Sequence, residues 1–118
     1  MAKILIVDDS LLLRNIIKNE VSYAGHEIVG EAVNGKEGVA LYEQHRPDIV
    51  TMDITMDEMN GLEAAEAILK KYPSAKVIMV TALDEEDVMK QAVKLGVKDF
   101  IVKPFVPERL LSAIEKAL

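Results

Sequence analysis

The stretch Ile4-Leu5-Ile6-Val7-Asp8-Asp9-Ser10 is an apolar run that ends abruptly in two acids. A run that is apolar at successive positions suits a strand covered on both faces, as in a parallel sheet. Four similar runs follow, at residues 28–30, 49–52, 77–80 and 100–102. The sequence therefore predicts five strands. The second is the weakest prediction, because it contains Gly30 and Glu31, which suit a sheet edge.

Amphipathic segments lie between these runs. Four of them carry apolar residues at helical spacing: Leu13, Ile16, Ile17, Val21 and Ala24; Leu62, Ala65, Ile68, Leu69 and Tyr72; Val88, Ala92, Val93 and Leu95; Leu110, Leu111, Ile114 and Leu118. A fifth segment, around Val39 and Tyr42, is a weaker helix prediction because it contains Gly38.

Helix starts are predicted at three polar residues that have an acidic residue three positions later: Asn34, Asn60 and Asp84. The first two resemble capping boxes, in which a side chain and a backbone N–H bond each other reciprocally. Gly25 and Gly96 follow two predicted helix ends, where glycine is favoured.

Strictly alternating strands and helices predict an α/β fold with a parallel sheet and helices on both faces. We expect one domain over residues 1–118, with no linker or further domain. The flavodoxin-like doubly wound order 2-1-3-4-5 fits five strands, although that order is taken from known proteins of this architecture. In such sheets ligands lie beyond the carboxyl ends of the strands.

Composition excludes several classes of function. The formal charge of −6 argues against direct nucleic-acid binding, which needs basic patches. The absence of Cys excludes disulfides and thiolate metal sites, and a reducing compartment fits. No stretch approaches the roughly 18 apolar residues of a membrane helix, and no signal peptide is recognisable. The expectation is a soluble cytoplasmic protein.

Charged and hydroxyl side chains stand at the predicted carboxyl ends of the strands. Asp8 and Asp9 follow the first strand, Asp53 the third, Thr81 ends the fourth and Lys103 follows the fifth. The first and third strands are neighbours in this order, so three carboxylates are expected at one corner. Three anions repel unless a cation compensates them. Mg²⁺ suits the site because it accepts one or two carboxylates and leaves positions for phosphate oxygens.

Asp53 is the best candidate nucleophile, because it ends a strand near the middle of the sheet and an aspartate can form an acyl phosphate. Lys103 and Thr81 would then neutralise or bind phosphoryl oxygens. The Lys103–Pro104 bond can be cis or trans, and trans is the simpler expectation. Phe100 is expected in the core, although its strand leaves room for a mobile aromatic.

The sequence resembles the response-regulator receiver family over its whole length. Five motifs carry the resemblance, in the family's order: Val7-Asp8-Asp9-Ser10, Met52-Asp53-Ile54-Thr55-Met56, Met59-Asn60-Gly61, Thr81-Ala82 and Lys103-Pro104-Phe105. The resemblance is greatest to the stand-alone chemotaxis regulators of this family, most of all in residues 48–56 and 98–105.

The resemblance implies a role for each site residue. Asp53 would be the phosphoacceptor, and Mg²⁺ would be bound by Asp8, Asp9 and Asp53 with the main-chain carbonyl of Thr55. Thr81 and Lys103 would contact the phosphoryl group. Thr81 and the aromatic Phe100 would form the switch.

The resemblance also implies partners. A histidine kinase would donate the phosphoryl group, and an output protein, such as a flagellar or archaellar motor switch or an adaptor, would bind the surface of the fourth helix, fifth strand and fifth helix. No turnover of an external substrate is expected.

Two residues depart from the family's usual pattern. Asp57 stands where Pro is usual, which should loosen the loop and adds charge near an acidic site. Phe100 stands where Tyr is frequent and cannot make that residue's hydroxyl hydrogen bond.

Other functions remain open at this stage. The chain could be the receiver of a transcription regulator or of another phosphorelay. An Asp-nucleophile phosphohydrolase would suit the same sheet, but its usual Asp-x-Asp is absent. A flavin carrier shares the fold, yet Asp8 and Asp9 would repel its phosphate. An interaction module that is never phosphorylated would show no response to Mg²⁺.

Overall fold

In a computed structural model that describes residues 1–118, strands and helices alternate along the whole chain. The strands are β1 (Lys3–Val7), β2 (Glu27–Ala32), β3 (Ile49–Met52), β4 (Val77–Thr81) and β5 (Asp99–Val102). The helices are α1 (Leu11–Tyr23), α2 (Gly35–His45), α3 (Gly61–Lys71), α4 (Glu86–Leu95) and α5 (Pro107–Ala117). The predicted repeat of strand and helix is confirmed.

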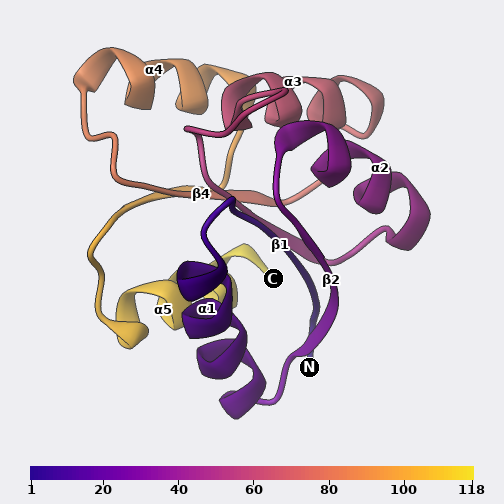
Figure 1. The fold of residues 1–118 in the computed structure, drawn as a ribbon, viewed down its shortest axis with the longest axis vertical. Coiled ribbons are helices and arrows are strands. Elements are labelled where there is room, and N and C mark those ends of the chain that lie inside the picture. The colour runs from indigo at the N-terminus through magenta and orange to yellow at the C-terminus, as the bar shows by residue number, and fades with distance from the viewer.

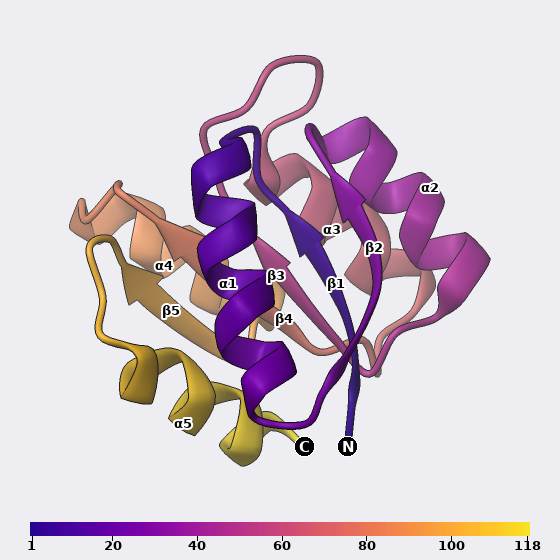
Figure 2. The same cartoon turned by 60° about the horizontal axis from the view of Figure 1, so that its bottom comes forward.

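The five strands form one parallel sheet in the order β2-β1-β3-β4-β5, as expected. The weakly predicted β2 is indeed an edge strand. Helices α1 and α5 cover one face, and α2, α3 and α4 cover the other (Figures 1 and 2). The order of strands reverses between β1 and β3, so the carboxyl ends of these two strands meet at the point where doubly wound folds bind ligands.

Two apolar cores, one on each face, hold the sheet between the helices. Every residue of β3 and β4 is buried, which explains why their sequences are apolar at successive positions. The core under α1 and α5 is rich in isoleucine: Ile4, Ile6, Ile17, Ile49, Ile78, Ile101 and Ile114 belong to it. None of the helices combines the length and apolar character needed to cross a membrane.

Helix starts agree with the prediction at two of three places. At Asn60 the full capping box with Glu63 is present. The Asn34 side chain accepts a hydrogen bond from the N–H of Glu37, whereas the Glu37 carboxylate turns to the N–H of Val33, so that box is incomplete. The predicted start at Asp84 is wrong.

Helix α4 begins at Glu86 and has no side-chain cap. The buried face of α4 is also narrower than its apolar residues predicted, because Val93 is 68% exposed and only Ala92 is fully buried. Ile16 and Leu118 likewise lie outside the core, at 38% and 48% exposed. Gly96 ends α4 with a φ of 97°, in the left-handed region that favours glycine.

Candidate functional site

The three predicted carboxylates meet at the carboxyl ends of β1 and β3. One carboxylate oxygen from each of Asp8, Asp9 and Asp53 lies within 4.8 Å of the others. Asp8 and Asp53 are almost buried, at 1% and 6% exposed, while Asp9 is exposed. The Asp53 side chain keeps 8% of its surface open, so it is recessed but not sealed from solvent.

Lys103 reaches this cluster from the loop that follows β5. Its Nζ lies 2.8 Å from Asp8 Oδ2 and 3.6 Å from Asp53 Oδ2. The N–H of Lys103 donates to the carbonyl of Thr81 across 2.8 Å, which ties this loop to the end of β4. The Lys103–Pro104 peptide bond is cis, so the simpler expectation of a trans bond is wrong.

Asp8 is held at three atoms. Its Oδ1 accepts the N–H of Ser10, its Oδ2 accepts Lys103 Nζ, and its carbonyl accepts Nη1 of Arg14 across 2.6 Å. Arg14 is buried in α1 and its Nε donates to Glu31 Oε1 on β2. Asp8 therefore has little freedom to move its main chain.

Arg14 was not singled out from the sequence. The available signal was its position on the helix. Arg14 is three residues before Ile17 and seven before Val21, so it lies on the same face as these two, the other buried residues of α1. A cation on the buried side of a helix needs a partner within the fold.

The charge of Asp53 is only partly compensated. Its Oδ1 accepts the N–H of Ile54 across 2.8 Å. Burial raises the pKa of the Asp53 carboxyl and the neighbouring charge of Asp8 raises it further, whereas Lys103, the Ile54 N–H and the Thr81 hydroxyl act in the opposite direction. A site with this excess of negative charge favours a divalent cation.

Thr81 and Phe100 are neighbours across β4 and β5. Phe100 pairs with Met79, two residues before Thr81, so all three side chains point to the face under α3 and α4. Thr81 is 1% exposed and its hydroxyl accepts the N–H of Leu83. Phe100 is half-buried against the core on this face, in agreement with the core prediction.

Two glycines fix the β3–α3 loop, which comprises residues 53–60 (Figure 2). The N–H of Gly61 donates to Ile54, and a Cβ on Gly61 would lie 1.9 Å from the carbonyl oxygen of Asp53. The N–H of Gly35 donates to Met59 in the same way, and a Cβ there would lie 2.2 Å from the Met59 carbonyl. The close approach at both ends explains why these positions are glycine.

Thr55 and Asp57 lie exposed in this loop. The Thr55 carbonyl accepts no backbone hydrogen bond. The carbonyl of Asp57 accepts the N–H of Met59 across 2.8 Å, around Glu58 at a φ of 72°. The residue in the usual proline position thus forms part of a tight three-residue turn.

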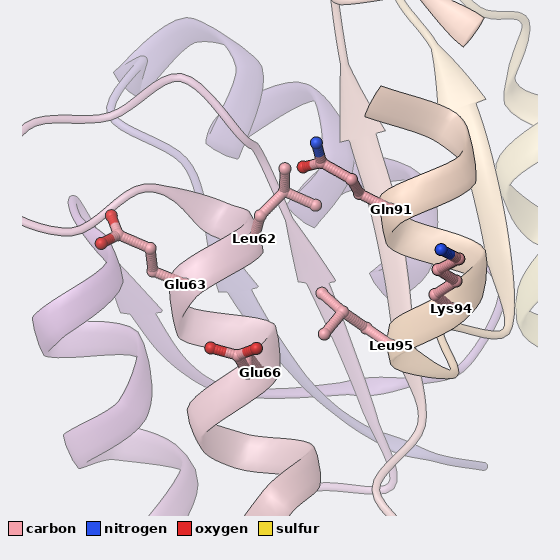
Figure 3. A pocket seen from close by; sticks show the side chains of 6 residues that line it. All are labelled: Leu62, Glu63, Glu66, Gln91, Lys94 and Leu95. Carbon is pink, nitrogen blue, oxygen red and sulfur yellow. The ribbon is translucent and has the colours of Figure 1, made fainter. Parts of the chain in front are cut away.

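A separate groove of about 440 Å³ lies between α3 and α4 (Figure 3). It is lined by Leu62, Glu63, Glu66, Gln91, Lys94 and Leu95. None of the predicted site residues lines it, so the acidic cluster remains the candidate site.

Comparison with known proteins decides the family. A family model described as the response regulator receiver domain matches residues 4–115. The chain belongs to this receiver family. The receiver is 54% identical over 117 residues to a chemotaxis protein CheY of Listeria monocytogenes, covering 99% of this chain and 98% of the relative. It is 48% identical to the CheY of Thermotoga maritima, covering 97% and 95%.

Solved structures agree with this assignment. The CheX–CheY–BeF₃–Mg²⁺ complex from Borrelia burgdorferi contains a chain that superposes on this receiver with a TM-score of 0.94 at 35% identity, covering 97% of this chain and 87% of that one. The protein is accordingly a phosphorylation-activated switch of two-component signalling. Receivers of this family bind Mg²⁺ at an acidic pocket, and they are signalling switches that do not turn over a substrate.

Proposed function

We propose that Asp53 accepts a phosphoryl group from a histidine kinase beside a bound Mg²⁺, and that the modified receiver binds an output protein of a chemotaxis system. The observation that carries this proposal is the gathering of three carboxylates and Lys103 at the strand ends. The relatives named CheY and the Borrelia complex with BeF₃ and Mg²⁺ support the chemistry and the pathway.

The residues present fit a magnesium ion. Three carboxylates offer oxygens within 4.8 Å of one another, and one lysine is the only cation paired with them. Asp8, Asp9 and Asp53 would hold the ion together with the main-chain carbonyl of Thr55, an exposed residue whose carbonyl accepts no backbone hydrogen bond. The ion would supply positive charge next to the phosphoryl oxygens.

In the transfer step, a carboxylate oxygen of Asp53 attacks the phosphorus of phosphohistidine. An O–P bond forms, the N–P bond breaks, and the electron pair of that bond returns to the imidazole. Lys103 is paired more closely with Asp8 than with Asp53 in this structure, at 2.8 Å against 3.6 Å. A cation held at Asp8 would compensate the charge of that carboxylate, and Lys103 could then pair with the phosphoryl group.

The response to phosphorylation would pass through Thr81 and Phe100. The new group carries about −1.5 to −2 charges and attracts the Thr81 hydroxyl, whose movement leaves space for the Phe100 ring. Beyond them the surface of α4, β5 and the β5–α5 loop exposes the apolar residues Met89, Val93, Val102 and Val106. An output protein such as a motor switch or an adaptor would bind there.

The test is chemical labelling of the pure protein. With Mg²⁺ and a small acyl phosphate donor, the wild type should gain the mass of one phosphoryl group, which alkali removes. Asp53→Asn should gain none, whereas the control Asp57→Asn, in the same loop but exposed, should be labelled. Alkali-labile labelling of Asp53→Asn would overturn the proposal.

A further inference from the structure

Arg109 of α5 forms an ion pair with Asp99, the residue before Phe100 in β5. Its Nη1 lies 2.9 Å from Asp99 Oδ2, and its Nη2 lies 2.8 Å from Asp99 Oδ1. The pair is therefore bidentate, with both oxygens of one carboxylate bonded to one guanidinium. Bidentate pairs of this kind are more directional than other surface ion pairs.

Both members of the pair also bond the main chain of Phe100. Asp99 Oδ1 accepts the Phe100 N–H across 2.7 Å, and Arg109 Nη2 donates to the Phe100 carbonyl across 3.3 Å. The Phe100 peptide groups are thus held on both sides by one ion pair, while the ring packs into the core on the opposite face.

The pair is only partly open to water. The side chains of Arg109 and Asp99 are 42% and 29% exposed. Hydrogen bonding to Arg109 lowers the pKa of the Asp99 carboxyl, and the pKa of Arg109 is raised by the same bond. Both groups therefore stay charged across the neutral pH range.

We call the Asp99–Arg109 pair and its bonds to the Phe100 main chain the clamp. A clamp on the main chain matters more for phenylalanine than it would for tyrosine at this position. A phenyl ring has no hydroxyl, so no hydrogen bond can hold it in one rotamer. Its two positions can differ only in packing, and packing depends on where the Cα lies. A loosely held strand would let the ring adopt both positions without a signal.

We propose that Asp99 and Arg109 are positioning residues of the switch: they fix the main chain of Phe100, so that the ring changes position only when the site at Asp53 is modified. This inference rests on the proposed function. A ligand shifts such an equilibrium only by its different interaction with the two states. Loss of the clamp should populate the second state beforehand and reduce the further change that modification produces.

The chain offers a direct probe, because it contains only two phenylalanines, Phe100 and Phe105. Labelling with 4-fluorophenylalanine gives two ¹⁹F resonances, which Phe105→Leu assigns. Spectra are recorded with and without Mg²⁺ and beryllofluoride, an analogue of the phosphoryl group. The wild type should show one narrow Phe100 resonance that moves on addition of the analogue.

Arg109→Gln and Asp99→Asn should broaden or displace the Phe100 resonance before the analogue is added, and should reduce its subsequent movement by about half or more. Arg109→Lys keeps the charge but loses the fork, so it should lie between the wild type and Arg109→Gln. Glu108→Gln, which removes a neighbouring charge that forms no ion pair with Arg109 and no hydrogen bond to Phe100, should match the wild type. Melting curves verify that each variant is folded.

Two failures are distinguishable. If the wild-type resonance moves but the Arg109→Gln and Asp99→Asn spectra match it with and without the analogue, the clamp has no positioning role and the inference is overturned. If the proposed function is wrong, the wild type itself takes no label on Asp53 and the analogue moves no resonance.

Discussion

The polar groups at the two ends of the sheet differ in how completely they are paired. We call these ends the amino rim and the carboxyl rim, after the ends of the strands that meet there. At the amino end, Asp48 Oδ2 accepts the Lys3 N–H and the Asp48 N–H donates to the Lys3 carbonyl, each across 2.8 Å. Nearby, buried His26 accepts the N–H of Ala2 through Nδ1 across 3.0 Å. Each of these groups has its own partner.

At the carboxyl end, by contrast, three carboxylates lie together, and Lys103 pairs with two of them, Asp8 and Asp53. The interactions at the amino rim therefore stabilise the fold. At the carboxyl rim the carboxylates repel one another, and a bound cation would reduce that repulsion. Substitutions at the amino rim should change stability alone, while substitutions at the carboxyl rim should also change binding of Mg²⁺.

The largest effect is expected from Gly61→Ala at the carboxyl rim. The new Cβ would lie 1.9 Å from the Asp53 carbonyl oxygen, so the loop that carries Asp53 must move. We expect a loss of about 3 kcal/mol in the free energy of unfolding, measured with urea, together with weaker Mg²⁺ binding.

The matched control is Gly25→Ala at the amino rim. Gly25 has a φ of 92° and no atom near its missing Cβ, so only backbone strain of about 1–2 kcal/mol is expected. Equal losses in the two variants, with Mg²⁺ binding intact in both, would contradict the distinction between the rims.

A smaller loss is expected from His26→Ala, which leaves the buried N–H of Ala2 without an acceptor. The cost should be about 2 kcal/mol, while the midpoint of a Mg²⁺ titration should equal that of the wild type. A changed Mg²⁺ midpoint in this variant would show that the two rims are not independent.

Glu31→Gln should cost about 1 kcal/mol at neutral pH. The hydrogen bond from Lys18 lowers the pKa of the Glu31 carboxyl below its ordinary value of 4.5, and Arg14 acts in the same direction. Because the folded pKa is depressed, the stabilisation is present above pH 4.5 and is lost as pH falls through the folded pKa.

Melting temperatures measured along a pH series check this prediction. The wild type should melt at a higher temperature than Glu31→Gln at about pH 7, and the melting temperatures of the two proteins should converge at about pH 2. The same difference at both ends of the series would mean that the charge of Glu31 is not what stabilises the fold.

The smallest effect compares two residues in the left-handed region, one at each rim. Glu58 has a φ of 72° and is exposed, so Glu58→Gly should raise stability by about 0.5 kcal/mol. Arg46 has a φ of 45° but lies 3.8 Å from the Tyr72 ring and donates to its hydroxyl. Arg46→Gly should therefore bring no gain, and thermal melting of both variants tests the contrast.

The fold could be predicted because its local signals agree. Strands buried on both faces are apolar at successive positions, and the site residues follow those strands directly, so knowing the order of strands was enough to bring them together. The start of α4 was misplaced because Asp84 is a good capping residue that the chain does not use there.

What the sequence did not show are contacts between distant elements. Arg14 bonds Asp8 through its main chain and reaches Glu31 on a strand 17 residues away. Arg109 of α5 forms an ion pair with Asp99 of β5, and a loop separates these two elements in the sequence. Neither pairing has a local pattern, since both depend on how two elements pack.

We propose Asp53 as the phosphoryl acceptor, in a pocket that a bound cation completes. The most direct measurement is a crystal structure of the protein grown with Mg²⁺ and beryllofluoride. We expect beryllium bonded to a carboxylate oxygen of Asp53, a metal ion contacting Asp8 and Asp9, and Lys103 Nζ moved from Asp8 to a fluorine. A structure in which Asp53 is unmodified under these conditions and Lys103 still pairs with Asp8 would contradict it.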